Sequence, residues 1–260
     1  MCGVFGYVSA GGQGPNLKRL ERLAVETERR GPHAFGFAWV DRVGRLKMFK
    51  ATGRISEHLG ILAMAGDARM LIGHCRYATH GEPGDNVNNH PHPVDGGWLV
   101  HNGVIGNYRE LVAEHGLHLV SECDSETLGL LVERGPGGRG WGLARRCAWA
   151  VDQTQEGPLV MMGLWARPQR MIVVRRGNPL CMGSTKRGTY LASLADGMPG
   201  DCVAVRDGSV MEWSFDRKGE SHGSRTTDLL SRADDGVVAG ACDAGAAGAC
   251  RATARRAWGF

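Results

Sequence analysis

The sequence predicts an α+β fold with two mostly antiparallel sheets. Short runs rich in Val, Phe, Trp and Met recur along residues 1–215 and are bounded by turn-forming residues, a pattern typical of strands. Apolar residues at helical spacing occur in only a few segments between these runs. The resulting order is a strand, a helix, more strands, a pair of helices and again strands, which favours an α+β domain.

Both patterns can be located along the chain. The segments expected to be helical are a helix of about three turns that begins near Leu17 and ends before Gly31, and residues 108–115, 125–133 and 143–151. The segments expected to be strands are residues 2–9, 35–40, 46–50, 70–76, 98–101, 159–166, 171–175, 189–193, 201–206 and 209–215. Asp207-Gly208 lies between the last two strands and is the signal of a hairpin turn.

The composition changes near residue 218. Gly, Ala, Ser and Asp dominate the remainder, and apolar periodicity is lost. Such a segment buries too little apolar surface to fold alone. We therefore expect a folded domain at residues 1–217, followed by a flexible or loosely docked tail at residues 218–260.

Bulk composition excludes several classes of function. The formal net charge is only +4, and the basic residues are scattered rather than gathered in a stripe, so direct nucleic-acid binding is not expected. A continuous apolar run long enough to cross a membrane is absent from the sequence, as is a signal peptide after Met1. The eight cysteines form no C-x-x-C pair. The sequence thus predicts a cytoplasmic protein with reduced thiols.

Cys2 stands directly after the initiator methionine. If Met1 is removed, one residue carries both a thiol and a free α-amine. That amine has an ordinary pKa near 8 and can accept the thiol proton near neutral pH. The pattern is therefore compatible with an N-terminal nucleophile, although a second-position cysteine alone is also compatible with no chemical role.

Polar residues follow the apolar strand that ends at residue 76. An arginine at this point can hold a carboxylate with two hydrogen bonds, so Arg76 is a candidate substrate-binding residue. Thr79 and His80 can add hydrogen bonds from the following loop. The alternative is an ordinary strand end with a surface arginine and a histidine that is paired locally.

Two further motifs permit a catalytic and a structural interpretation. Asn102-Gly103 follows a strand and is normally a turn, but an amide side chain next to a glycine N–H also forms an oxyanion hole. Asp124 precedes an expected helix and is normally a cap, but it can instead bind a substrate ammonium group.

His90 and His92 alternate with prolines in a polar loop. Two histidines at this spacing suggest a metal site, and a zinc-binding module is one alternative function. A third ligand is not evident nearby in the sequence, and zinc sites need three or four. We therefore expect a structural or active-site loop, with neither metal nor cofactor.

Taken together, these motifs resemble the glutaminase domain of the class II glutamine amidotransferases, above all that of the glutamine–fructose-6-phosphate aminotransferases. The resemblance extends from residue 1 to about residue 215. The segments that match in order and spacing are residues 1–6, 30–36, 73–81, 89–92, 100–111, 120–127, 175–180, 190–193 and 207–208.

The resemblance implies a four-layer αββα fold, that of the N-terminal-nucleophile hydrolases. It implies that Cys2 is the nucleophile, with its own amine as base, and that Asn102 and Gly103 form the oxyanion hole. L-Glutamine would be held at its α-carboxylate by Arg76, with Thr79 and His80 nearby, and at its α-ammonium by Asp124. Tyr77 replaces a family tryptophan in the loop expected to close over glutamine. The reaction implied is hydrolysis through a thioester to glutamate and ammonia.

The resemblance leaves the ammonia acceptor undefined. We expect the sugar-isomerising domains that follow in the aminosugar-forming relatives to have no counterpart after residue 215. We therefore expect a separate synthetase or transferase subunit to receive the ammonia in trans. Two alternatives remain from the sequence: a hydrolase of another γ-glutamyl amide, and a non-catalytic glutamine-binding regulatory subunit.

Overall fold

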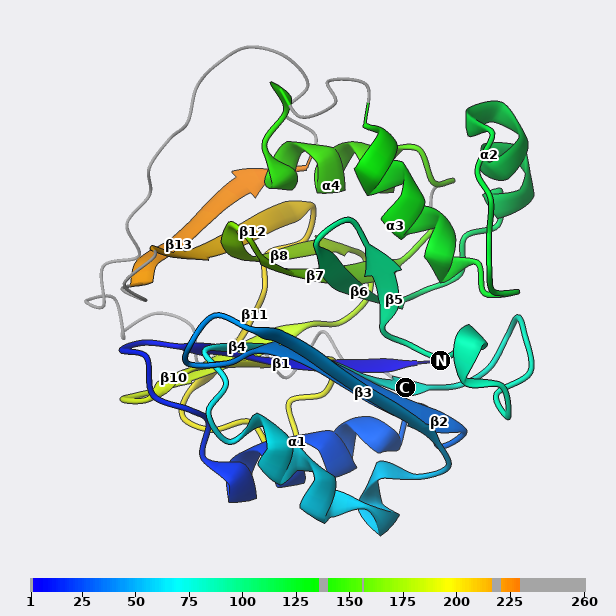
Figure 1. Cartoon of the computed structure of the whole chain (residues 1–260). Coiled ribbons are helices and arrows are strands. Elements are labelled where there is room, and N and C mark those ends of the chain that lie inside the picture. The colour runs from blue at the N-terminus through cyan, green and yellow to red at the C-terminus, as the bar shows by residue number, and fades with distance from the viewer. Residues whose placement is uncertain (1, 136–139, 156, 217–220, 230–260) are drawn as a thin grey trace.

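A computed structural model describes residues 2–135, 140–155, 157–216 and 221–229. The described chain forms four layers, with two antiparallel sheets stacked face to face and helices on the outer face of each (Figure 1). This architecture confirms the α+β class and the αββα arrangement expected for an N-terminal-nucleophile hydrolase.

The first sheet places the N-terminus of the domain at its centre. Its seven strands run in the order β11 (Cys202–Ala204), β9 (Cys181–Thr185), β10 (Gly188–Ala192), β1 (Gly3–Ser9), β4 (Met70–Arg76), β2 (Ala34–Val40) and β3 (Leu46–Thr52). In the antiparallel pair of β1 and β4, Gly3 lies opposite Cys75. Cys2 is therefore held beside the C-terminal end of β4.

The second sheet stacks on the first. Its six strands run in the order β13 (Ser221–Asp228), β12 (Ser209–Phe215), β8 (Gln169–Arg176), β7 (Leu159–Ala166), β6 (Gly97–Asn102) and β5 (His92–Val94). β13 pairs with β12 from Ser209 opposite Asp228 onward. The sheet thus extends past the domain boundary expected at residue 217, and residues 230–260 of the expected tail lie outside the described residues.

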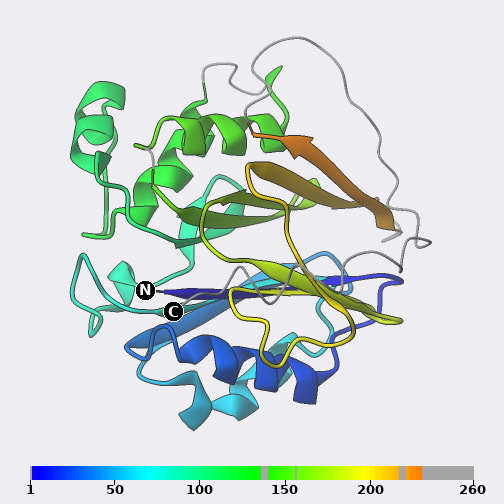
Figure 2. The ribbon, with the colours of Figure 1, turned by 180° about the vertical axis from the view of Figure 1, so that it is seen from behind.

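Helices cover the two outer faces, as the front and back views show (Figures 1 and 2). α1 (Leu17–Glu28) packs on the seven-stranded sheet, together with the short 3-10 segments Ile55–Glu57 and Leu59–Ala65. α3 (Ser125–Arg134) and α4 (Leu143–Asp152) pack on the six-stranded sheet, and α2 (Tyr108–His115) lies beside α3. A further 3-10 turn, Asn86–Asn88, lies in the loop between β4 and β5.

Local sequence explains where α1 begins and where α2 ends. The Asn16 side chain accepts a hydrogen bond from the Arg19 N–H and caps the start of α1. Gly116 adopts φ 54° after α2, a left-handed conformation that glycine takes at little cost. These local signals set two of the helix boundaries in the outer layers.

Three apolar layers hold the four-layer structure together. The central one lies between the sheets and contains Val4, Ile72, Val100 and Met162, all fully buried. The other two lie between each sheet and its helices. Gly6 allows the sheets to approach closely, because a Cβ there would lie 2.6 Å from the Met162 Cε atom.

We expect Gly73→Ala to destabilise the fold. A Cβ at Gly73 would lie 2.2 Å from the Phe5 ring, and Phe5 is fully buried under α1. Overpacking of this kind costs about 1–3 kcal/mol. Urea unfolding should therefore show a lower midpoint for this variant. Gly60→Ala is the matched control, because a Cβ at Gly60 would meet no described atom within 4 Å; an equal loss in both variants would contradict the explanation.

The Asp207-Gly208 turn is present but does not form the expected hairpin. Gly208 has φ 63°, as such turns require. However, β11 before the turn belongs to the seven-stranded sheet and β12 after it to the six-stranded sheet. The turn therefore links the two sheets, and the hairpin prediction was wrong.

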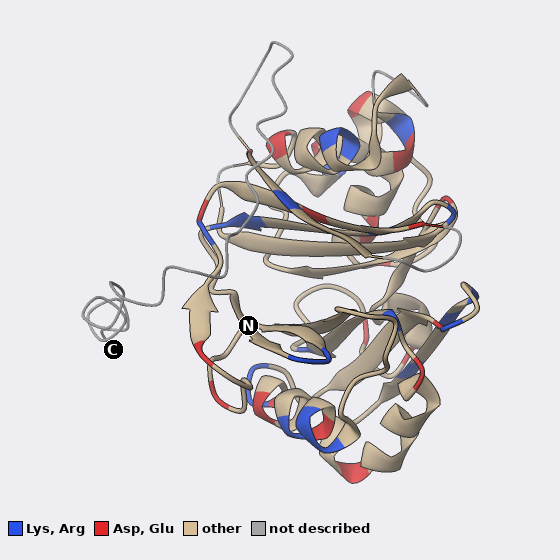
Figure 3. Cartoon of the chain, turned by 90° about the vertical axis from the view of Figure 1, so that its left-hand side faces the viewer, with Lys and Arg blue, Asp and Glu red and all other residues tan. Residues whose placement is uncertain are grey.

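Charged residues of both signs lie next to one another along the outer helices (Figure 3). This distribution agrees with the small net charge of +4. Among the described residues, every helix is too short or too polar to traverse a bilayer.

Candidate active site

Cys2 lies where β1 and β4 meet at one edge of the seven-stranded sheet. The Tyr77 N–H donates to the Cys2 Sγ atom at 3.3 Å, and the thiol lies 3.3 Å from the Tyr77 carbonyl oxygen. Arg30 Nε donates to the Cys2 carbonyl at 2.8 Å. The residue after Arg30 must be glycine, because a Cβ at Gly31 would lie 2.4 Å from the Arg76 carbonyl carbon. The Cys2 thiol is thus held in place by backbone atoms of the neighbouring segment.

The thiol shares its electrostatic environment with Arg76 and Asp124. Burial raises the pKa of the Cys2 thiol, and the hydrogen bond with the Tyr77 backbone lowers it. The positive charge of Arg76 also lowers this pKa, whereas the negative charge of Asp124 raises it. Burial is the largest of these effects, so the thiol is protonated near neutral pH. A nucleophilic role therefore requires a base.

Arg76 ends β4 and is buried. Its Nη1 atom donates to Asn89 Oδ1 at 2.8 Å, and its Nη2 atom donates to the carbonyls of His80 and of Gly81, the latter at 3.0 Å. These bonds use three of the five guanidinium N–H donors. Arg76 therefore organises the loop after β4 and keeps donors for a further acceptor.

The loop after β4 carries the other predicted binding residues. Tyr77 is exposed, and its ring lies 4.7 Å from the ring of His33. His33 accepts a hydrogen bond from the Ala78 N–H at 3.1 Å through Nδ1. Thr79 is exposed on the loop, whereas His80 is half-buried, with Nδ1 4.0 Å from an Asp124 carboxylate oxygen. The structure thus brings His80, but not Thr79, to Asp124.

Asn102 and Gly103 lie at the end of β6. Asn102 is buried, and its Nδ2 atom has no hydrogen-bond partner among the described residues. A Cβ at Gly103 would lie 2.7 Å from His101 Nε2, so only glycine fits. An unpaired buried amide donor is costly, and oxyanion holes contain such donors.

Asn178 is a supporting residue with no role predicted from the sequence. Its Nδ2 atom donates to the Asn102 carbonyl at 2.8 Å and to the Pro158 carbonyl at 3.0 Å. It therefore holds the Asn102 backbone from the segment after β8. The motif at residues 175–180 was its only signal in the sequence.

Asp124 precedes α3 but does not cap it through its side chain. Oδ2 instead accepts a hydrogen bond from the Ile105 N–H at 2.7 Å, and Oδ1 faces His80. The carboxylate is buried, so it links the segment after Asn102 to the loop after β4. A buried carboxylate with one oxygen turned towards the loop is suited to a cationic group.

Four buried histidines lie behind these residues. The His74 and His90 rings are 3.8 Å apart, and the His90 and His92 rings 4.6 Å apart. His74 Nε2 is 3.0 Å from the His101 carbonyl, which ties the two sheets together. Burial lowers the pKa of His92 to about 3 and that of His101 to about 4, so both rings are neutral.

Comparison with known proteins gives a consistent picture. The chain is 37% identical over 219 residues to a glutamine–fructose-6-phosphate aminotransferase (isomerizing) of Aeropyrum pernix, covering 80% of this chain and 33% of the relative. It is 34% identical over 208 residues to the Corynebacterium efficiens protein of the same name, covering 76% and 33%. The chain is a homologue of the class II glutamine amidotransferases. It spans about a third of the length of these relatives.

Solved structures support the fold of this amidotransferase homologue. The glutamine phosphoribosylpyrophosphate amidotransferase of B. subtilis matches with a TM-score of 0.71 at 22% identity, covering 89% of this chain and 50% of that one. A glutamine aminotransferase class-II domain protein of Silicibacter pomeroyi matches with a TM-score of 0.58 at 14% identity, covering 87% and 99%. No family model matches the chain.

Proposed function

We propose that this amidotransferase homologue is a glutaminase that releases ammonia from L-glutamine through a thioester on Cys2. The observation that carries the proposal is the unpaired, buried Asn102 amide at the end of β6, in a fold that also places Cys2, Arg76 and Asp124 in one electrostatic environment. The homology to glutamine-using enzymes supports the choice of substrate.

Substrate binding uses opposite charges at the amino acid head. The α-carboxylate of glutamine pairs with Arg76, and the α-ammonium pairs with Asp124, with His80 beside it. A zwitterion needs one cation and one anion, and these two buried side chains supply them. The γ-amide is then directed towards the Cys2 thiol.

The chemical steps require a base, because burial keeps the Cys2 thiol protonated. Once Met1 is removed, the Cys2 α-amine takes the thiol proton, and the sulfur forms a bond to the γ-carbonyl carbon. Asn102 Nδ2 and the Gly103 N–H stabilise the oxyanion. The ammonium then gives its proton to the leaving nitrogen, the C–N bond breaks, and water hydrolyses the thioester to glutamate.

We propose that the ammonia passes to a separate synthetase or transferase subunit in the cytoplasm. The described cysteines are all free thiols, which supports a reducing setting. The relatives are about three times as long as the aligned part, so this chain aligns with only part of an amidotransferase. Co-purification from the native host, followed by transfer of amide-labelled nitrogen to an acceptor, tests this step.

Glutamate release from glutamine by the purified chain tests the proposed reaction. Turnover with glutamine in preference to other γ-glutamyl amides supports a glutaminase. A clear preference for another γ-glutamyl amide would mean that glutamine is not the substrate, while the proposed mechanism would still apply. Glutamine binding without any turnover by correctly processed protein would make the chain a regulatory subunit instead.

We expect Asp124→Asn to raise KM for glutamine by about tenfold to a hundredfold with a smaller effect on kcat. The amide keeps an oxygen for the Ile105 N–H but loses the charge that attracts the ammonium. Steady-state kinetics measure the effect, and Asp207→Asn, at the turn between the sheets, is the control. A lower stability with unchanged KM would instead make Asp124 a structural anchor.

A further inference from the structure

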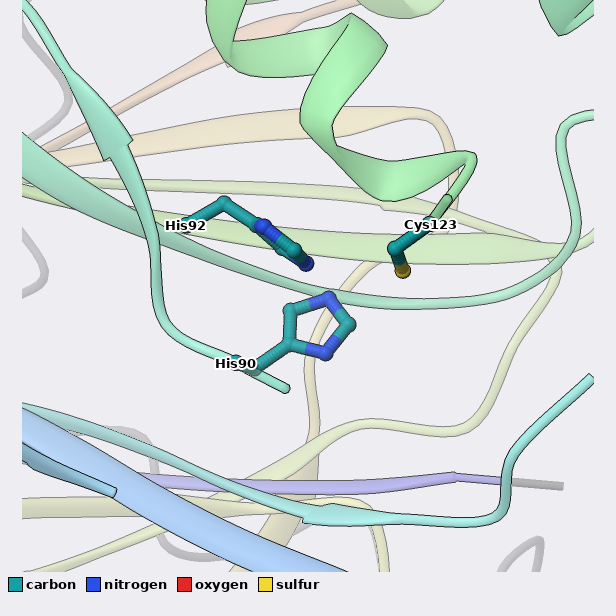
Figure 4. Close-up of side chains that lie close together, drawn as sticks. All are labelled: His90, His92 and Cys123. Atoms are coloured by element: carbon teal, nitrogen blue, oxygen red, sulfur yellow. The ribbon is translucent and has the colours of Figure 1, made fainter. Parts of the chain in front are cut away.

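The fold completes a group of metal-binding side chains that the sequence alone leaves incomplete. His90 lies in the loop before β5, His92 is the first residue of β5, and Cys123 lies in the turn before α3 (Figure 4). One ligand atom of each lies within 4.8 Å of the other two, and all three residues are buried. Cys123 is the third ligand that the His-Pro-His segment lacked.

The histidines of this cluster carry nitrogen atoms that protein groups do not satisfy. Both ring nitrogens of His90 and the Nε2 atom of His92 have no hydrogen-bond partner within the described part of the chain. His90 is 3% exposed and His92 is 1% exposed. Buried polar atoms without partners are rare in folded proteins, so this cluster requires an explanation.

We propose that His90, His92 and Cys123 bind a zinc ion. Two imidazole nitrogens and one thiolate form a ligand set that zinc prefers, with a fourth position left for water or another oxygen ligand. In a tetrahedral zinc site the ligand atoms lie about 3.3–3.8 Å apart, so these side chains must close by about 1 Å.

The surrounding charges are mixed. Arg76 and Lys50 are close enough to lower the pKa of His92, and their positive charges disfavour the binding of a cation. The Cys123 thiolate formed on zinc binding and the Asp124 carboxylate, 3.8 Å from the Cys123 Sγ atom, offset them. Asp124 is also the residue proposed to hold the glutamine ammonium, so zinc would occupy the wall of that site. The binding proposal itself does not depend on the glutaminase reaction.

The experiment measures zinc directly in untagged, full-length protein. Cys2→Ala serves as the background, because an N-terminal aminothiol can bind zinc by itself. The protein is stripped with a chelator, given zinc, desalted and analysed by native mass spectrometry and elemental analysis. We expect one zinc per chain, and competition with a chromogenic chelator gives its affinity. Cobalt(II) in place of zinc should give a near-ultraviolet thiolate charge-transfer band.

Variants distinguish this cluster from adventitious binding. In the same background, Cys123→Ala should lower the affinity for zinc at least about a hundredfold and abolish the cobalt band. His92→Asn should lower the affinity for zinc by a similar factor. Cys202→Ala, which removes an exposed thiol, should change neither. Circular dichroism of each zinc-free variant confirms folding. If Cys123→Ala fails to fold, the zinc affinity of the His92→Asn variant tests the proposal instead. Absent zinc in the background protein, or unchanged affinity in the folded variants, would overturn the proposal.

Discussion

Replacing Cys2 by alanine is expected to abolish glutamine hydrolysis, with a fall in kcat of at least about a thousandfold. The sulfur is the atom that forms the thioester, and no other described cysteine is held against the end of β4 by the Tyr77 backbone. Glutamine binding should survive, because Arg76 and Asp124 remain. Glutamate release and isothermal titration with glutamine measure the two properties separately.

Cys202→Ala is the matched control for this experiment. Cys202 is an exposed thiol on β11, an edge strand of the same sheet. Its removal should leave turnover unchanged. Activity within tenfold of the unmodified enzyme in Cys2→Ala would show that another group attacks the amide, and the proposed mechanism would fail.

The second large effect is expected for Asn102→Ala. Its unpaired Nδ2 atom is proposed to stabilise the oxyanion, and loss of one such donor lowers kcat by about 10²–10³. KM should change little, because the ground-state substrate carries no charge on that oxygen. Stopped assays over a range of glutamine concentrations separate the two constants.

Asn107→Ala provides a control from the same segment. Asn107 bonds to the Gln153 carbonyl and the Gln155 N–H and so joins the start of α2 to the segment after α4. Its loss should affect stability rather than kcat. Equal kcat values for Asn102→Ala and the unmodified protein would show that Asn102 is not part of the oxyanion hole and has a structural role instead.

Most of the regular structure was predictable because its signals are local. α1 has alternating apolar and charged residues at helical spacing, and β7 is a continuous apolar run. β5, β9 and β13 were missed for physical reasons. β5 is only three residues long and contains a proline, within a segment expected to be a polar loop. β9 contains a glycine and polar residues, and β13 is a polar edge strand with exposed side chains, so neither carries the apolar pattern of a buried strand.

The site was less predictable because it depends on contacts between distant segments. The sequence singled out Arg76 and Asp124, but only the fold brings both close enough to Cys2 to affect the pKa of its thiol. Asn178 holds the Asn102 carbonyl from 76 residues away. The joining of Cys123 to His90 and His92 depends on how α3 packs beside β5, which no local pattern specifies.

The intact mass of the protein before and after treatment with a glutamine-mimicking diazo-ketone tests whether Cys2 is the glutaminase nucleophile. We expect loss of Met1 and a single adduct that maps to Cys2, with protection by excess glutamine. Protein from the native host that retains Met1, or processed protein that forms no adduct at Cys2, would contradict this role of Cys2.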